Sequence, residues 1–335
     1  MARQGRREPG SLKLVLPATS ANLGPAFDCA ALALRLFLTI KAQTADEFSI
    51  DAAGRDSDIC GRLENNLIVE TYTELLRREH RTVLPLALQI ENEIPIGKGC
   101  GSSAAARLAG IALAVHFGGL AWGCDQITAE AARREQHADN AAACWLGGLC
   151  LAKMPAAADA SCEVISIKPK GKWPLLLAVP ETPLSTQQAR DLLPTLYHRA
   201  DAISNIQNSM FLVAAFMEGR PEQLGPALAD TMHQPYRAEL CPLLSSLQKL
   251  TGTGSILGAV LSGAGPSVLL FLEPGANVSR TMTSVSRHLL SEGLSAELLP
   301  TTISAFGASR SLALPGVAGF SCRSGRKSYG PPQLC

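Results

Sequence analysis

A glycine-rich segment at residues 95–106 constrains the fold of this chain more than any other stretch. It reads Pro-Ile-Gly-Lys-Gly-Cys-Gly-Ser-Ser-Ala-Ala-Ala. Residues 86–91 before it alternate apolar and polar side chains, as a half-buried strand does, and apolar residues recur after it at near-helical spacing. The glycines therefore lie in a turn between a strand and a helix. Because the first N–H groups of a helix lack intrahelical partners, such a turn is a ready site for an anion such as phosphate.

A tight turn that only packs a small-residue helix onto a sheet would leave a similar pattern, and a lone glycine motif is weak evidence for a ligand. Ser102 and Ser103 favour the phosphate interpretation, because neighbouring hydroxyls at a helix start can reach a phosphate oxygen or its Mg²⁺. The segment lacks the G-x-x-x-x-G-K-[ST] pattern, and its G-x-G-x-G spacing is not that of a dinucleotide-binding turn.

Composition narrows the class of protein. The net charge of +1 gives no global field, so we expect neither nucleic acid nor a membrane as a partner. Ten cysteines are scattered without C-x-x-C pairs or zinc spacing, which predicts a reducing, cytoplasmic location. We find neither a secretory signal nor an apolar window long enough to span a bilayer.

The length of 335 residues predicts two domains. We expect a disordered basic tail at 1–10, a first domain at 11–158, a second domain at 159–312 and a disordered tail at 313–335. The alanine-rich stretch at 155–161 is interpreted as a linker or a hairpin tip.

Two polar segments in the first domain allow more than one interpretation. Residues 17–28 are small, polar and interrupted by Gly and Pro, which predicts a loop. Asn22 and Asp28 in it are candidates for function, although local turn chemistry would also explain them. Asn66 directly precedes an amphipathic helix, for which capping is the plain role.

A second chemical cluster comprises Glu135, His137, Asp139 and Asn140, which we place on one predicted helix. Glu135 and Asp139 are four residues apart and would share a helix face, whereas His137 would lie elsewhere unless the helix ends there. Such a group could bind a metal or orient a substrate. A solvated helix face, helped by two neighbouring arginines, remains the alternative.

The order of these segments along the chain resembles that in a known protein family. Residues 16–28, 95–106, 135–140 and 261–267 together resemble the GHMP small-molecule kinases over about residues 11–310. Within that superfamily the chain is similar to the homoserine kinase family. This rests on the S-A-N-L-G-P-x-F-D loop, the H-x-D-N cluster, the Leu-Ser-Thr run followed by Arg190, and the His-Gln-Pro-Tyr-Arg run at 233–237.

The sequence departs from the family pattern at three positions. Ala26, Cys100 and Ala138 stand where the family usually has Gly, Leu and Pro. None of these changes removes a side chain expected to do chemistry, although Ala26 narrows the backbone freedom of the substrate loop.

The resemblance implies an α+β, two-domain GHMP kinase fold, with an N-terminal ribosomal-protein-S5-like, ATP-binding domain and a C-terminal ferredoxin-like domain. It implies phosphorylation of the side-chain hydroxyl of L-homoserine by ATP, giving O-phospho-L-homoserine on the route to threonine. Mg²⁺ assists, no dedicated catalytic base is expected, and the family expectation is a homodimer.

The resemblance also implies roles for particular residues. The catalytic set is Ser103, Glu135 and Asn140, of which Ser103 and Glu135 hold Mg²⁺, an ion that prefers oxygen ligands. The nucleotide-binding set is Asn66, Pro95, Ile96, Gly97, Lys98, Gly99, Cys100, Gly101, Ser102, Ser103, Ala104 and Ala105. The substrate-binding set is Asn22, Asp28, His137, Asp139, Thr186, Arg190 and Arg237.

The residue types agree with an amino-acid substrate. Arg190 and Arg237 suit a carboxylate, since guanidinium pairs with it through two hydrogen bonds, and Asp28 or Asp139 suits an ammonium group. Another GHMP kinase, acting on mevalonate, a sugar or a shikimate-type alcohol, is the first alternative. A silent sensor of the amino acid or of ATP is the second, and it would predict loss of the serine pair or of Glu135.

Overall fold

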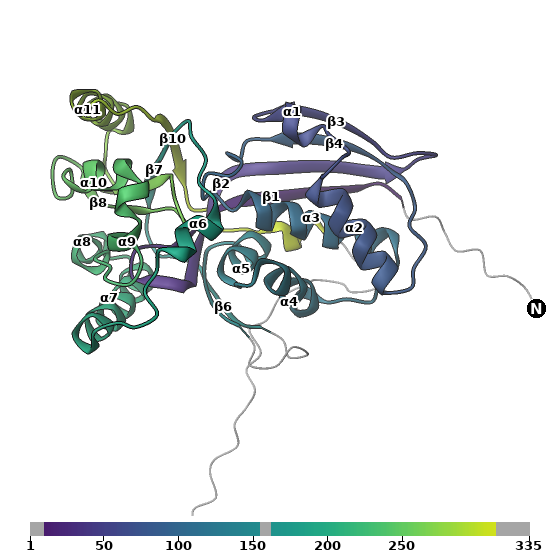
Figure 1. Ribbon diagram of the computed structural model, residues 1–335, viewed down its shortest axis with the longest axis horizontal. Helices are drawn as coiled ribbons and strands as arrows, with labels where there is room; N and C mark the ends of the chain where they lie inside the picture. Colours follow the sequence, from purple (N-terminus) through teal and green to yellow (C-terminus); the bar gives the residue numbers. More distant parts are fainter. Residues whose placement is uncertain (1–9, 155–161, 313–335) are drawn as a thin grey trace, which may run out of the picture.

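The structure, a computed structural model, describes residues 10–154 and 162–312 (Figure 1). The predicted tails, apart from Gly10, and the predicted linker at 155–161 lie outside the described residues. Two sheets lie side by side, each with its own helices, so the predicted α+β class is confirmed. Within the described ranges no helix is long and apolar enough to cross a bilayer.

The first half is built on a six-stranded sheet in the order β3-β4-β2-β5-β6, with β1 paired to β2. Only β3 and β4 are parallel; the other pairs are antiparallel. The strands are β1 (Leu12–Asn22), β2 (Ala26–Thr44), β3 (Ser49–Gly54), β4 (Leu86–Asn92), β5 (Leu149–Lys153) and β6 (Glu163–Ile167).

Helices of the first half pack on this sheet around α3, which is buried along most of its length. They are α1 (Ser57–Cys60), α2 (Leu67–Arg78), α3 (Ser102–Phe117), α4 (Cys124–Glu135) and α5 (Asp139–Leu146). Small residues let α3 approach its neighbours closely: Gly110 lies against the backbone of α2, where a side chain would overlap Ile68 and Thr71. The apolar run at 145–152 divides between two elements, because Trp145 belongs to α5 and β5 begins only at Leu149.

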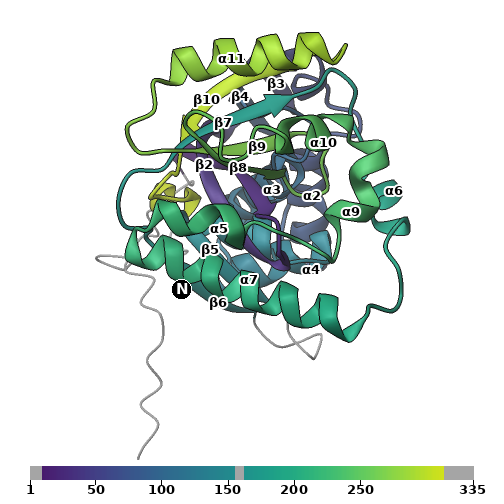
Figure 2. The ribbon, with the colours of Figure 1, turned by 90° about the vertical axis from the view of Figure 1, so that its left-hand side faces the viewer.

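The second half holds an antiparallel sheet in the order β10-β7-β9-β8. Its strands are β7 (Pro174–Val179), β8 (Ile256–Leu261), β9 (Val268–Leu272) and β10 (Glu297–Thr302). Its helices are α6 (Thr186–Asp191), α7 (Arg199–Glu218), α8 (Leu224–Ala227), α9 (Gln234–Arg237), α10 (Pro242–Gln248) and α11 (Val278–Ser291). Figure 2 shows α11 along one edge of this half and α7 along the opposite edge.

The first half includes chain segments on both sides of the second half in sequence. The predicted boundary at 158 and 159 falls between β5 and β6, which are paired strands of one sheet, so the first half continues to Ile167. Near the C-terminal end, the N–H of Ser304 donates to the carbonyl of Ala33 over 2.8 Å. The following 3₁₀ helix (Ala308–Ser311) packs on β1. Linker composition at 155–161 could not reveal this pairing, because it depends on partners distant in sequence.

The predicted loop at 17–28 is mostly a β-hairpin, which corrects that expectation. The end of β1 and the start of β2 occupy most of this segment. The tight turn that joins them contains Asn22, Leu23 and Gly24, all with positive φ. The tip reaches into the second half (Figure 1), where Asn205 and Ser209 of α7 both donate to the carbonyl of Pro25. A side chain at Gly24 would overlap the backbone of the second half, so the turn requires glycine there.

Candidate active site

The glycine-rich segment forms the predicted turn between β4 and α3. Gly97, Gly99 and Gly101 have φ of 71°, 76° and 71°, a region that side chains disfavour. Helix α3 begins at Ser102, and no side chain at 10–154 or 162–312 caps its first turn. Its first N–H groups therefore stay available to an anion, and the helix dipole adds partial positive charge at the same place.

Contacts from both halves fix the shape of this turn. The Lys98 ammonium donates to the carbonyls of Pro180 and Glu181, each over 2.7 Å, so it is engaged away from the turn's open side. Ser262 donates to the carbonyl of Gly99 over 2.7 Å. Cys100 is buried, and burial raises the pKa of its thiol to about 12. Its side chain packs in the interior, and the three glycines around it have left-handed conformations.

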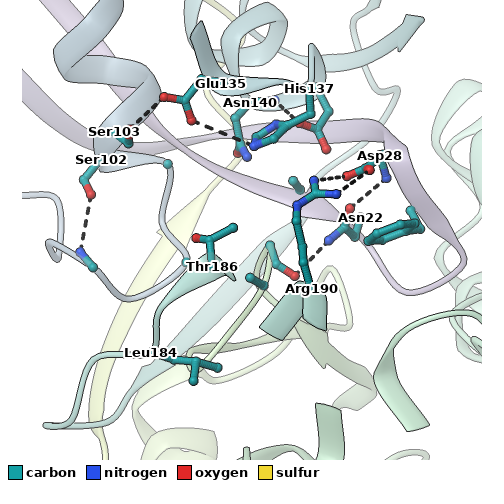
Figure 3. A pocket seen from close by; sticks show the side chains of 18 of the residues that line it. Asn22, Asp28, Ser102, Ser103, Glu135, His137, Asn140, Leu184, Thr186 and Arg190 are labelled. Carbon is teal, nitrogen blue, oxygen red and sulfur yellow. Dashed lines mark hydrogen bonds and ion pairs between the residues drawn. The ribbon is translucent and has the colours of Figure 1, made fainter. Parts of the chain in front are cut away.

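A cavity between the two halves gathers residues from six separate stretches of the chain (Figure 3). Its walls are formed by Ala21, Asn22, Phe27, Asp28, Gly97, Gly99, Gly101, Ser102, Ser103, Glu135, His137, Asp139, Asn140, Leu184, Thr186, Arg190, Arg237, Gly263 and Ala264. The start of α3 borders one side, and acidic and basic side chains face it across the cavity.

Ser103 and Glu135 meet beside the start of α3. The Ser103 hydroxyl donates to Oε1 of Glu135 over 2.7 Å, and Nη1 of Arg107 lies 2.9 Å from the same oxygen. The other oxygen, Oε2, lies 3.9 Å from Nε2 of His137. The Ser103 hydrogen bond and the Arg107 ion pair thus hold the carboxylate through Oε1, while Oε2 and the lone pairs of Ser103 are left for another ligand.

A helix break explains how the second cluster converges. Helix α4 ends at Glu135, Gln136 takes a positive φ of 64°, and α5 begins at Asp139. The expected single helix through this cluster is therefore wrong. The break turns His137 back so that its Nδ1 lies 2.7 Å from Oδ1 of Asp139. Burial opposes the charged imidazole, but Asp139 and Glu135 outweigh it and raise the pKa of His137.

An ion pair between the halves forms the opposite wall. Arg190 of α6 donates two hydrogen bonds to Asp28 of β2, with distances of 3.0 and 2.8 Å. Both side chains are about one-third exposed, at 33% and 35%. Asn22 positions the same strand, because it accepts from the N–H of Asp28 and donates to the carbonyl of Gly263.

Arg237 is buried to 1% exposure yet reaches the cavity wall. It donates to the carbonyl of Ala189 over 2.9 Å and lies 3.1 Å from Nδ1 of His233, and no carboxylate pairs with it among the described residues. Burial and the charge of Arg190 lower its pKa. Its guanidinium lies 5.3 Å from the ring centre of Phe27.

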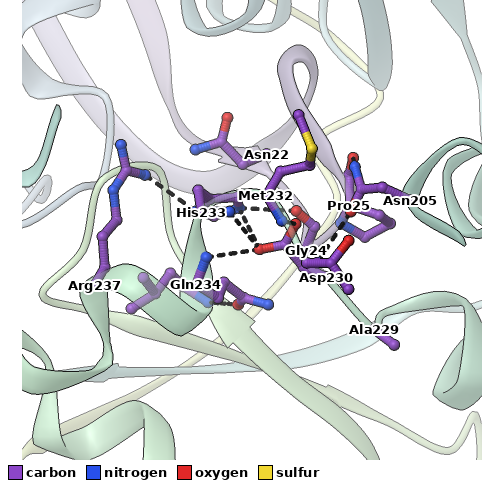
Figure 4. A network of polar contacts seen from close by, with 12 residues as sticks. Asn22, Gly24, Pro25, Asn205, Ala229, Asp230, Met232, His233, Gln234 and Arg237 are labelled. Atoms are coloured by element: carbon purple, nitrogen blue, oxygen red, sulfur yellow. Dashed lines mark hydrogen bonds and ion pairs between the residues drawn. The ribbon is translucent and has the colours of Figure 1, made fainter. Parts of the chain in front are cut away.

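His233 links this arginine to the hairpin tip (Figure 4). An arginine can only donate, so Nδ1 of His233 accepts, and Nε2 carries the hydrogen that it donates to the carbonyl of Gly24 over 2.8 Å. Burial lowers the pKa of His233, in agreement with this neutral form. Asp230 accepts from three successive N–H groups at 232–234 and fixes the segment.

The remaining predicted polar residues complete the cavity. Asn140 accepts a hydrogen bond from the Thr19 hydroxyl through Oδ1, which leaves its amide hydrogens for a ligand. Thr186 begins α6, one turn before Arg190, and lines the same wall. Within the described residues no group of three or more His, Cys, Asp or Glu side chains is arranged to hold a metal ion alone.

Comparisons with known proteins agree with this geometry. The GHMP kinases N terminal domain family matches residues 66–148, and the GHMP kinases C terminal family matches 212–289. A homoserine kinase from Solibacter usitatus is 42% identical, and the match covers 78% of this chain and 85% of the relative. The chain belongs to the homoserine kinase family. Another family member, from Deinococcus radiodurans, is 32% identical over 87% of this chain and 94% of the relative.

The crystal structure of homoserine kinase from Cytophaga hutchinsonii shares the fold. Its TM-score is 0.74 at 21% identity, and the match covers 92% of this chain and 98% of that one. The predicted GHMP kinase fold is thereby confirmed.

Some predicted site residues of this homoserine kinase family member lie outside the cavity. All predicted substrate-binding and catalytic residues line it, whereas part of the predicted nucleotide set does not: Asn66, Pro95, Ile96, Lys98, Cys100, Ala104 and Ala105. Asn66 accepts from the N–H groups of Ile68 and Val69, and it donates to two carbonyls before α2. Its observed role is helix capping, and a role near adenosine stays a prediction.

Several residues that shape the cavity were not among the site residues predicted from the sequence. Thr19, Phe27, Arg107 and His233 all shape the cavity or its lining side chains. Arg107 left a readable signal, because it follows Ser103 by four residues on the helix and therefore shares its face. Thr19 left none, since its partner Asn140 is distant in sequence and the pairing arises only in the folded sheet.

Proposed function

We propose that this chain transfers the terminal phosphoryl group of ATP to the side-chain hydroxyl of L-homoserine, giving O-phospho-L-homoserine and ADP. The observation that carries the proposal is one cavity with two unlike walls. One wall is the uncapped start of α3, which suits phosphate, and the other holds Asp28, Arg190 and Arg237, which suit a zwitterion.

The phosphate wall supports nucleotide binding. Backbone N–H groups of residues 97–103 and the dipole of α3 would stabilise the phosphates of ATP. The left-handed glycines leave the backbone bare, so phosphate oxygens can approach the N–H groups closely.

Ser103 and Glu135 fit a magnesium ion as donors. Ser103 gives its hydrogen to Glu135 and keeps its lone pairs, and Glu135 keeps Oε2. Mg²⁺ takes few protein ligands and completes its shell with water and phosphate oxygens, so two suffice. When bound, the ion would neutralise charge that accumulates on the phosphates during transfer.

The opposite wall supports recognition of an amino acid. Arg237 has no acidic partner in the part of the chain that the structure describes, so a substrate carboxylate would supply the missing charge, with Arg190 beside it. Asp28 or Asp139 would pair with the ammonium group. Asn22, His137, Asn140 and Thr186 would orient the carbon chain and its hydroxyl toward the phosphate wall.

Each carboxylate of the cavity is already engaged, which supports transfer without a dedicated base. Asp28 pairs with Arg190, Asp139 with His137, and Glu135 with Ser103 and Arg107. Phosphoryl transfer proceeds largely by alignment and charge stabilisation, so the hydroxyl proton can leave to a phosphate oxygen or to water. A cytoplasmic location and a homodimer are part of the same proposal.

A coupled assay of ADP release tests the function. Homoserine, mevalonate, galactose and a blank without acceptor are compared under the same ATP and Mg²⁺ conditions. We expect release with homoserine well above the other three. Release with mevalonate or galactose alone would assign the chain to another GHMP reaction, and no acceptor-dependent release at all would leave only ligand sensing.

A further inference from the structure

Helix α7 is apolar on two opposite faces. Its inner face buries Leu212, Ala215 and Phe216 against the second half. Its outer face exposes large apolar side chains, among them Ile206 at 61% and Met210 at 69%. Figure 2 shows α7 in front, with none of the described elements over it. An ordinary surface helix has one apolar stripe, so a second one indicates a second packing partner.

The outer side chains follow a regular spacing. Ile203, Ile206, Met210, Val213 and Met217 are separated alternately by three and four residues. All are exposed except Val213, which is half-buried. This is the spacing with which one helix packs along another, and it makes a seam rather than a scattered set of apolar residues. The seam therefore favours a helix as the covering element.

The seam is nearly symmetric about its centre, which favours a second copy of the same helix. Ile203 and Met217 each lie seven residues from Met210. An antiparallel copy related by a two-fold axis at Met210 would therefore place Met210 opposite its own copy and Ile203 opposite Met217.

The ends of α7 carry balanced charge. Arg199 and Asp201 lie in its first turn, and Glu218 and Arg220 lie at or just after its end. Each end thus carries one base and one acid, so pairing of two copies brings no net charge together at either end. A lipid surface is disfavoured, because the outer face lacks the row of basic residues that such helices carry.

We propose that the outer face of α7 is the contact between two copies of this chain. The two helices pack antiparallel, and Met210 lies next to its counterpart at the two-fold axis. This assigns a surface to the homodimer, and the assignment does not depend on the reaction.

The contact also bears on the cavity. The inner face of α7 carries Asn205 and Ser209, which hold the carbonyl of Pro25 at 2.5 and 2.9 Å. That carbonyl belongs to the hairpin tip between Asn22 and Asp28. Pairing of α7 therefore steadies the wall proposed to bind homoserine. This consequence, unlike the contact itself, rests on the proposed function.

Sedimentation equilibrium of the full chain tests the surface. We expect the wild-type chain to be a dimer and Met210→Lys, which places two ammonium groups together at the axis, to be a folded monomer. Leu290→Lys is the matched control, because Leu290 is 78% exposed on α11, away from the seam, and should remain a dimer. A monomeric wild-type chain, or a Met210→Lys variant that stays dimeric, would overturn the proposal.

A crosslinking experiment tests the axis itself. Met210→Cys should form a covalent dimer under mild oxidation, because only a residue at a two-fold axis meets its own copy. Leu290→Cys and the wild-type chain measure the background from native cysteines. Crosslinking of Met210→Cys no greater than this background would rule out the antiparallel arrangement.

Kinetics test the link to the cavity. In Met210→Lys we expect the KM for homoserine to rise at least about fivefold while that for ATP changes little. An unchanged KM in a monomeric variant would refute the link and leave the contact standing. A wild-type chain that is dimeric but inactive with homoserine would instead refute the proposed function alone.

Discussion

Ser103 donates its hydroxyl hydrogen to Glu135 across 2.7 Å, joining the first turn of α3 to the last residue of α4. The two residues are 32 positions apart in sequence. The hydrogen bond sets the direction of the hydroxyl, so the oxygen lone pairs point away from the carboxylate. One of the two helices presents N–H groups and the other a carboxylate, which brings anion-binding and cation-binding groups to one edge of the cavity.

Glu135→Gln should lower kcat by at least about 100-fold, which corresponds to about 2.7 kcal/mol in the barrier. The amide keeps the shape but loses the negative charge proposed to hold Mg²⁺, while the homoserine wall is untouched. Steady-state kinetics and calorimetric titration with homoserine measure the two effects separately. Glu273→Gln, on the exposed surface, is the control. A near-normal kcat in Glu135→Gln would remove the metal assignment.

Arg107→Met should strengthen binding of a divalent cation at least about fivefold, because a guanidinium 2.9 Å from Oε1 of Glu135 repels a second cation at the same carboxylate. At the same time kcat should fall, since the carboxylate loses the ion pair that helps to orient it. Mn²⁺ binding followed by electron paramagnetic resonance measures the affinity without turnover. Arg62→Met, an exposed arginine elsewhere, is the comparison. If both variants bind Mn²⁺ as the wild-type chain does, Arg107 does not act on the metal site.

Arg190→Ala should raise the KM for homoserine by about 10-fold or more and leave the KM for ATP nearly unchanged. The side chain pairs with Asp28 on the wall opposite the phosphate turn, so its loss affects one substrate. Initial rates with each substrate varied in turn decide this, with Arg280→Ala as a surface control. Equal rises in both KM values would mean that Arg190 only supports the fold.

Glu130→Gln should cost about 3 kcal/mol or more in the free energy of unfolding. The Glu130 side chain is 1% exposed and accepts hydrogen bonds from Arg78, Arg133 and Arg134, which would be left without their common acid. Urea denaturation measures the loss. Glu74→Gln removes a 61% exposed partner of Arg134 and should cost less than about 1 kcal/mol. Equal costs would contradict a buried network.

The same residue predicts a pH dependence. Burial opposes ionisation of Glu130, but the arginines outweigh it and lower its pKa from 4.5 to about 2. The unfolded chain therefore binds a proton more readily than the folded one. This contribution to stability is complete above pH 4.5 and is lost as the pH falls toward 2. Acid titrations of stability should thus be steeper for the wild-type chain than for Glu130→Gln; parallel curves would argue against the shift.

Much of the site was predictable because its signals are local in sequence. The spacing of Gly97, Gly99 and Gly101 before a helical pattern predicts a turn. All three adopt left-handed conformations in that turn. The order of the motifs identified the family, and the predicted substrate residues line one cavity. The roles of motif residues can be predicted from sequence in this way because each of them acts through its own chemistry.

Features that depend on distant partners were not predictable. Gln136 takes a left-handed conformation that nothing in its side chain requires, and this break brings His137 and Asp139 together. The pairing of β6 with β5 and the return of the chain to β1 likewise arise from tertiary contacts. The composition of a segment indicates its own local structure. It does not indicate which distant segment it will contact in the folded chain.

The hairpin between β1 and β2 constrains how ligands can enter. Its tip is held by α7 and His233, so a hinge motion separating the halves would have to withdraw the tip and break those hydrogen bonds together. Helix α6 carries Thr186 and Arg190 on the same cavity but buries only Ala189. Because Arg237 and Asp28 hold α6 by hydrogen bonds alone, we expect α6 to be displaced at a lower cost than the hairpin tip.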